Sequence, residues 1–528
     1  MVGDPIDTHG GPTTFWTRVN AAEALPGVIT PLTWTFYARA SEISVRTAFA
    51  ELGVLRRSEI EWPADPDHRF IGVFYGRAAI NLDQFRAMAD RSPGQSGDAL
   101  EREFFGTVRP GVSSAPLRRR YALVAAKTPR AAFGVQRRLT RLEAEADAWW
   151  RRVVTDPQLS DPDRARTVLR EAADLYTRVM VPHTIGTMLT PAFFTQLAAL
   201  ATRAGHPGLE LRLVTGQSVP ETVWLNELWE IAHGSGDLAA FVAQHGYHGP
   251  DEGELSAHPW REDAASLRAM TERFRDLPVD QAPAAVERRR AAEAAEAERI
   301  LMSALSALSG ARRPGARLLL RIVRHFMPLR ETGRAAFLRA IDGARAAARS
   351  LGTNLHHDGV LKDPDDVFFL TMDELSGMLP PDVADVVAER RARFDEYRTF
   401  DLPDAWTGRP EPMPIAEDPS GGSADLSGFA VSPGVVEGPV RVVSGAEELD
   451  SLEPGEILVC PSTDPSWSLA FVLAAGLAID VGGPLSHGAI VAREMGVPCV
   501  INTRVGTRVL RTGDRVRLDG GAGTVTRI

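Results

Sequence analysis

The sequence contains almost no lysine. Of its 59 basic residues, only Lys127 and Lys362 are lysines, and all the others are arginines. Neither lysine follows a G-x-x-x-x-G-K-[ST] loop or sits in a V-A-I-K strand, the motifs that hold phosphates in P-loop proteins and protein kinases. Those two kinds of nucleotide site are therefore excluded, and Schiff-base chemistry could use only these two residues.

Cysteine is equally scarce. Cys460 and Cys499 are the only two cysteines, so the chain has neither a disulfide framework nor a cysteine zinc cluster. Both lie in apolar patterns typical of buried strands. We therefore expect them to be packing groups with inert thiols.

Long apolar runs and blocks of basic charge are also missing. The longest apolar run, 469–479, is far shorter than the ~20 residues of a membrane-spanning helix. The start, MVGDPIDTHGGP, lacks the basic and apolar regions of a signal peptide. The net charge is −10 with no basic patch in the sequence. We expect a cytoplasmic protein that binds neither nucleic acid nor membrane.

The composition, with 44% hydrophobic and 24% charged residues, is that of a globular protein. Apolar residues recur at three-and-four spacing through most of 15–399, which predicts a mainly α-helical domain over 1–399. Four segments show the pattern most clearly: 142–154, 163–179, 279–308 and 315–351.

The texture changes at residue 400. Residues 400–428 are rich in proline, glycine and serine, which predicts a flexible hinge linker. From 429 to 528, short β-type runs alternate with glycine-rich turns and two helical patterns, which predicts a small α/β domain. Gly520-Gly521 between the last two runs predicts a closing hairpin.

The segment DVGGPLSHGAIVAREMGVPCVINT, residues 480–503, carries the clearest chemistry. A buried strand runs into a glycine-rich turn, Ser486 occupies an N-cap position, and a helix follows that ends at Gly496. His487 then lies in the first turn, where the helix field favours an anion beside a neutral imidazole. Glycines 482, 483 and 488 leave room for a bulky group. The pattern fits a transiently phosphorylated histidine, although a polar helix cap is the simpler alternative.

The run GGxxSHxxIVARExGxP, residues 482–498, resembles the signature of the swivelling phosphohistidine domain of PEP-utilising enzymes. That domain occurs in pyruvate phosphate dikinase, phosphoenolpyruvate synthase and rifampin phosphotransferase, and 431–443, 452–467 and 473–483 resemble it too. The resemblance implies a β/β/α swivelling domain with His487 as phosphoryl carrier and Ser486 beside it. It also implies that the backbone of Gly482, Gly483 and Gly488 lies near the phosphoryl group.

The resemblance extends upstream. Five segments are similar to the helical substrate domain of rifampin phosphotransferase and prodigiosin ligase-type synthetases: 15–34, 75–82, 245–263, 327–352 and 365–375. Such relatives normally begin with an ATP-grasp domain, and this sequence starts where that domain should have ended. It also lacks their phosphoenolpyruvate barrel. The resemblance therefore implies that Mg²⁺ and ATP are bound by an ATP-grasp (PEP/pyruvate-binding-like) partner in trans.

A swivelling phosphohistidine needs a second station that neutralises the phosphoryl group and holds an acceptor. Arg330 and Arg334, four residues apart on a predicted helix, could clamp phosphate oxygens together. They resemble the R-E-x-x-K motif of the family, with Arg334 in the lysine position. Glu331 and Arg339 lie near the same stripe as candidate substrate-binding residues. The alternative is a solvated arginine-rich helix.

A second candidate lies in the loop HGYHGPDEGELSAHPWRED. His245, His248, Glu252 and Arg261 could bind the acceptor or supply a general base for its hydroxyl group. Structural hydrogen bonding is the alternative. The H-x-x-H spacing alone is weak for zinc, and we assign no metal ligand.

The sequence leaves three hypotheses open. The first is the carrier and acceptor-binding subunit of a split ATP-dependent dikinase-like phosphotransferase that acts on a small molecule, by phosphorylation or by activation for condensation or dehydration. The second is a phosphorylation-independent condensing or eliminating enzyme. The third is a regulatory protein that lost its ATP domain.

Overall fold

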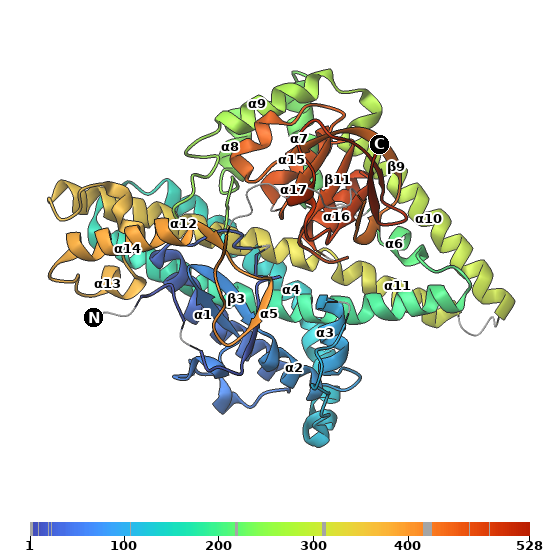
Figure 1. The fold of residues 1–528 in the computed structure, drawn as a ribbon, viewed down its shortest axis with the longest axis horizontal. Coiled ribbons are helices and arrows are strands. Elements are labelled where there is room, and N and C mark those ends of the chain that lie inside the picture. Colours follow the sequence, from blue (N-terminus) through green and yellow to red (C-terminus); the bar gives the residue numbers. More distant parts are fainter. Residues whose placement is uncertain are drawn as a thin grey trace. The chain divides into compact units, whose positions relative to one another are not determined.

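The computed structural model describes residues 4–528 except 9, 20, 23, 106, 217–219, 309–312, 415–424, 464 and 485. Its contacts divide the chain into two compact units (Figure 1). Unit 1 comprises Met1–Ile185, Gly253–Ala257 and Thr332–Glu417. Unit 2 comprises Gly186–Glu252, His258–Glu331 and Asp418–Ile528. The division falls within two helices, α5 (Pro162–Arg203) and α12 (Leu329–His357), which contribute residues to both units.

Unit 1 is mainly helical, as the periodicity predicts. Its helices are α1 (Pro31–Glu51), α2 (Leu82–Asp90), α3 (Gly97–Phe105), α4 (Tyr121–Val154), α13 (Met372–Ser376) and α14 (Val383–Tyr397), with parts of α5 and α12. The start of α1 shows the local logic. Pro31 occupies the first turn, and the N-cap Thr30 side chain accepts a hydrogen bond from the Thr33 backbone N–H.

A small antiparallel sheet in the order β2-β3-β1-β5 completes unit 1. Its strands are β1 (Phe15–Thr17), β2 (Ile71–Phe74), β3 (Arg77–Asn81) and β5 (Ala405–Thr407), and β4 (Phe400–Asp401) pairs separately with β6 (Met413–Pro414). Because β5 pairs with β1, residues 400–414 of the expected linker belong to unit 1. Residues 415–424 of the expected linker lie outside the described residues, and the boundaries 1–399, 400–428 and 429–528 stay a prediction.

Unit 2 contains a second group of helices: α6 (Leu209–Leu213), α7 (Pro220–Ala232), α8 (Leu238–His245), α9 (Ala265–Arg273), α10 (Pro283–Leu308) and α11 (Arg313–Phe326). The predicted helical run 315–351 is broken, since α11 ends at Phe326 and α12 begins at Leu329. Pro328 stands between them, and proline cannot supply the N–H that a continuous helix needs. The break places Glu331 in the first turn of α12.

The C-terminal part of unit 2 is an α/β module around an eight-stranded sheet in the order β7-β14-β13-β9-β10-β11-β12-β8. The strands are β7 (Asp425–Ser427), β8 (Phe429–Ser432), β9 (Val435–Val442), β10 (Ile457–Cys460), β11 (Gly476–Ile479), β12 (Cys499–Ile501), β13 (Arg515–Asp519) and β14 (Thr524–Arg527). Strands β9 to β12 run parallel, and β13 and β14 form the predicted hairpin. A large helical region followed by a small α/β domain is therefore confirmed.

Three helices belong to this module: α15 (Ser468–Leu473), α16 (His487–Met495) and α17 (Gly506–Val509). Helix α16 contacts α7 and α10, and α15 contacts α7 and α9, as Figure 1 shows in the upper part of the molecule. Apolar side chains of the helices and the module share one core, in which Trp224 and Phe274 join Phe471 and Val491. The module therefore packs on the helices of its own unit through a continuous hydrophobic core.

One described helix, α5, is long and apolar enough to cross a membrane by length and composition alone. Core helices of soluble proteins pass the same test, and this helix contributes Leu197 and Ala201 to a buried core cluster. The expectation of a cytoplasmic protein without membrane contact stays a prediction.

Candidate functional site

The site begins at the carboxyl end of β11. Asp480 follows this strand and is buried, and its carboxylate accepts hydrogen bonds from the Thr503 hydroxyl at 2.6 Å and the Thr507 backbone N–H at 3.0 Å. The backbone N–H of Gly506 also donates to it. These bonds tie β11 to the loop after β12, so the turn that leads to α16 starts from a fixed point.

The turn and the first residues of α16 depend on glycine. Gly482 has φ +146°, and a Cβ there would lie 2.4 Å from the Ile501 side chain. A Cβ on Gly488 would lie 2.6 Å from Thr463 Oγ1, so this glycine lets the first turn of α16 pack closely on its neighbours. Nothing lies within 4 Å of a Cβ on Gly483, which is open space.

Helix α16 is capped as the sequence predicts. The Ser486 side chain accepts a hydrogen bond from the Ala489 backbone N–H at 3.4 Å, and the helix ends at Gly496 with φ +70°. Arg493 donates from Nη1 to the Pro484 carbonyl at 2.7 Å, which ties the helix to its own entry turn. Burial lowers the pKa of Arg493 to about 10.

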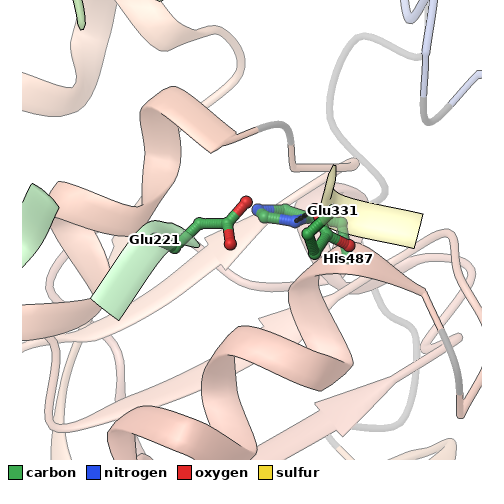
Figure 2. A group of neighbouring side chains, drawn as sticks. All are labelled: Glu221, Glu331 and His487. Carbon is green, nitrogen blue, oxygen red and sulfur yellow. Dashed lines mark ion pairs between the residues drawn. The ribbon is translucent and has the colours of Figure 1, made fainter. Parts of the chain in front are cut away.

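His487, the first residue of α16, has no exposed surface. Its Nδ1 lies 3.7 Å from Glu331 Oε2, and Glu221 lies on the same site. One ligand atom of each of the three residues lies within 4.8 Å of the other two. Figure 2 shows the Glu221 carboxylate directed at the imidazole from one helix and Glu331 beside the ring from another. Both glutamates are buried, with exposed fractions of 4% and 2%.

The three side chains come from the N-terminal turns of three helices: Glu221 from α7, Glu331 from α12 and His487 from α16. A helix N-terminus carries a partial charge of about +0.5, which stabilises carboxylates and phosphate groups nearby. The partial positive charge at the start of α16 disfavours a protonated imidazole, whereas the two carboxylates favour it. The result is a buried group of one imidazole and two carboxylates at three helix N-termini.

Helix α16 is also held against the helices of unit 2 by residues that share the face of His487, since they lie three and seven positions further on. Glu494 accepts a hydrogen bond from the Gly216 backbone N–H at 2.8 Å. Ile490 belongs to a core cluster with Leu213, Leu301 and Leu320 from α6, α10 and α11. The face of α16 that carries His487 is therefore packed against helices of its own unit.

The three predicted arginines of α12 have different surroundings. Arg330 lies in the first turn of α12, with Nε 3.9 Å from Glu331 Oε1. Arg334 is buried on the same helix, one turn further on, in unit 1. Arg339 pairs with Glu143 at 3.1 Å and with Asp147 at 3.2 Å, which fastens α12 to α4. Glu331 is thus brought to His487 in unit 2, Arg330 is its neighbour in the chain, and Arg339 has the contacts of a structural residue.

The predicted loop residues form pairs. His248 Nδ1 lies 2.9 Å from Glu252 Oε2, and both residues are buried. His245 Nε2 lies 3.1 Å from Glu227, and Arg261 lies 2.8 Å from Glu262. The His248 ring also lies near the ring of Trp224, with centroids 6.0 Å apart. Trp224 is on α7, one turn after Glu221. A role for these residues in binding an acceptor stays a prediction.

The sequence analysis did not single out Glu221 and assigned no metal ligand. Pro220-Glu221 opens α7 in the way that many ordinary helices begin, so no local signal marked it. Its importance comes from the packing of α7 on α16. The cysteines, in contrast, are buried as expected, and desolvation raises the pKa of Cys499 to about 12.

Two segments of the chain are similar to known protein families. Residues 179–331 match the rifampicin phosphotransferase fourth domain, and residues 452–523 match the mobile domain of PEP-utilising enzymes. The resemblance to this branch is therefore confirmed.

Three known proteins are similar to large parts of this chain. The chain is 33% identical to a rifampicin phosphotransferase of a Streptomyces species over 58% of this chain and 36% of the relative. It is 29% identical to the prodigiosin synthesizing transferase PigC of Serratia marcescens, over 55% of this chain and 33% of the relative. An uncharacterised phosphotransferase of Bacillus subtilis, YvkC, is 36% identical over 35% of this chain and 23% of the relative. The chain spans about a third or less of these relatives.

Proposed function

We propose that this chain, which carries a PEP-utilising mobile domain and a rifampicin phosphotransferase fourth domain, is the phosphohistidine carrier and acceptor-binding part of an ATP-dependent phosphotransferase. His487 carries the phosphoryl group and a small molecule receives it. The donor reaction is assigned to an ATP-grasp protein in trans, which binds ATP and Mg²⁺, as the resemblance of the sequence implies.

The observation that supports this most strongly is the position of His487. The side chain lies at the N-terminal end of α16 and faces Glu331, inside the unit that unites the two matched domains. A histidine that only capped a helix would not need a buried site assembled from three helices. The same residues form a station at which a phosphoryl group could leave the histidine.

Complete burial also constrains the catalytic cycle. A nucleotide cannot reach an imidazole with 0% exposure, so the module must leave this position to be loaded and return to deliver. In this proposal the buried arrangement of His487 is the delivering position, and the linker expected at 400–428 is the hinge about which the module moves.

In the delivering step the P–N bond breaks and its electron pair returns to the imidazole nitrogen. A new P–O bond forms to the acceptor, and the proton of the acceptor hydroxyl passes to a base. Arg330, at the start of α12 in unit 2, is proposed to stabilise the phosphoryl oxygens during transfer, and the same role for Arg334 stays a prediction. Ser486 and the backbone of Gly482, Gly483 and Gly488 are proposed to accommodate the phosphoryl group.

The test is a labelling experiment on the full chain. Purified protein is incubated with [β-³²P]ATP and Mg²⁺, with and without an ATP-grasp protein encoded nearby, and wild type is compared with His487→Ala. We expect acid-labile label on wild type alone and only with the partner. Label on the His487→Ala variant, or none on wild type with any partner or with phosphoramidate as a chemical donor, would contradict the proposal.

A further inference from the structure

We propose that Glu221 is the base that removes the proton from the acceptor hydroxyl group as the phosphoryl group leaves His487. The inference deepens the proposed function and rests on it. It assigns to α7 a role that the sequence reasoning gave to the loop around His248.

Two carboxylates face His487, and they differ in what surrounds them. Glu331 faces Nδ1 at 3.7 Å and has Arg330 Nε at 3.9 Å from its other oxygen. Because Glu331 lies on the Nδ1 side of the ring, the proposal assigns the phosphoryl group to Nε2. Glu221 reaches the site from a different helix, and Figure 2 shows its carboxylate directed at the ring.

The distance suits a base. Phosphoryl transfer is roughly in line, so the acceptor oxygen lies beyond the phosphorus on the side away from the imidazole. In a near-attack arrangement it stands about 3–3.5 Å from the phosphorus. One carboxylate oxygen of Glu221 lies within 4.8 Å of a nitrogen of the His487 ring, so this carboxylate is next to the atoms between which the phosphoryl group would pass. Glu221 is therefore placed to accept the proton as the P–O bond forms.

Two glutamates and a histidine could instead hold a divalent cation. The three helix N-termini that meet here disfavour a cation and favour an anion, so the base is the better assignment. The experiment must therefore distinguish a catalytic base at Glu221 from a bound cation.

The experiment uses water as the hydroxyl acceptor, because it requires no knowledge of the natural one. The full chain is loaded on His487 with phosphoramidate, or with ATP and the partner, and the release of phosphate is followed after the donor is removed. Wild type is compared with Glu221→Gln, with Glu221→Asp and with Glu227→Gln, a change on the same helix at a glutamate that pairs with His245. Thermal unfolding of each variant establishes that it is folded.

We expect equal loading in all four proteins and at least a tenfold slower release in Glu221→Gln. Glu221→Asp should recover part of the rate, and Glu227→Gln should match wild type. The ratio of wild-type to Glu221→Gln rates should fall towards one as the pH drops through the range in which carboxylates become protonated.

Equal release from wild type and Glu221→Gln would overturn the role of Glu221 while leaving the phosphohistidine intact. Release that stops with EDTA, together with Mn²⁺ binding that disappears in Glu221→Gln, would replace the base by a metal ion. Failure to load wild type with either donor would instead contradict the proposed function itself, so the two failures are distinguishable.

Discussion

His487 Nδ1 lies 3.7 Å from Glu331 Oε2, and both residues stand in the first turn of a helix. The two helices belong to different parts of the sequence: α12 begins within the last residues of the rifampicin phosphotransferase fourth domain match, and α16 lies inside the mobile domain match. Their meeting is what makes the buried histidine a candidate for phosphoryl transfer rather than an ordinary helix cap.

The hydrogen bond from Gly216 to Glu494 should hold the module in the delivering position. A hydrogen bond to a charged acceptor contributes about 1.5–3 kcal/mol, and each 1.4 kcal/mol is tenfold in an equilibrium. We expect Glu494→Ala to speed modification of His487 by diethylpyrocarbonate about tenfold, measured by peptide mass spectrometry. Glu437→Gln, a change at an exposed partner of Arg517 on β9, is the control. Equal rates in the three proteins would show that this bond does not hold the module.

Gly488 should tolerate no larger side chain. An added Cβ would lie 2.6 Å from Thr463 Oγ1 and 2.9 Å from Ile479 Cδ1, so Gly488→Ala must displace one of them. Overpacking of this kind costs about 1–3 kcal/mol, which urea unfolding would measure. Gly483→Ala is the matched control, because its Cβ meets nothing within 4 Å. A Gly488→Ala variant as stable as the control would contradict the packing.

The pair formed by His248 and Glu252 should stabilise the fold. Its members are buried and lie 2.9 Å apart, so His248→Ala leaves a buried carboxylate without this partner. We expect a loss of about 1–3 kcal/mol in unfolding free energy. His258→Ala, at a histidine with a mostly exposed side chain, should change stability little. If His248→Ala instead left stability intact and slowed phosphate release from His487, the loop would be the base and Glu221 would not.

The thiols should be unreactive in the folded chain. Desolvation raises the pKa of Cys499 to about 12, and burial also raises the pKa of Cys460. Because only the thiolate reacts, roughly one Cys499 thiol in ten thousand is reactive at pH 8, and the fraction grows as the pH rises. Ellman's reagent should label neither cysteine at pH 8 in native protein and both in guanidinium. Rapid native labelling would contradict their burial.

Local patterns in the sequence predicted the module well. The bounds of β10 and β12, the Ser486 cap, the end of α16 at Gly496 and the final hairpin all follow from turn chemistry and short apolar runs. These features depend on neighbours in the chain, so periodicity and capping residues are sufficient to find them.

The site itself could be predicted only in part. His487 was found because its turn, cap and helix are contiguous, but Glu221 was not, since its role depends on the packing of α7 against α16. The break at Pro328 was also missed, and without it Glu331 would lie inside a helix rather than at its positive end. Long-range packing determines which first turns meet, and a local pattern contains no record of it.

The proposal that His487 carries a phosphoryl group is tested most directly by locating that group on the chain. The full chain is incubated with ATP, Mg²⁺ and the ATP-grasp partner, digested at neutral to alkaline pH so that the P–N bond survives, and mapped by mass spectrometry. We expect one phosphorylated residue, His487, in the peptide that contains Ser486. A phosphoryl group on any other residue, with His487 unmodified, would contradict it.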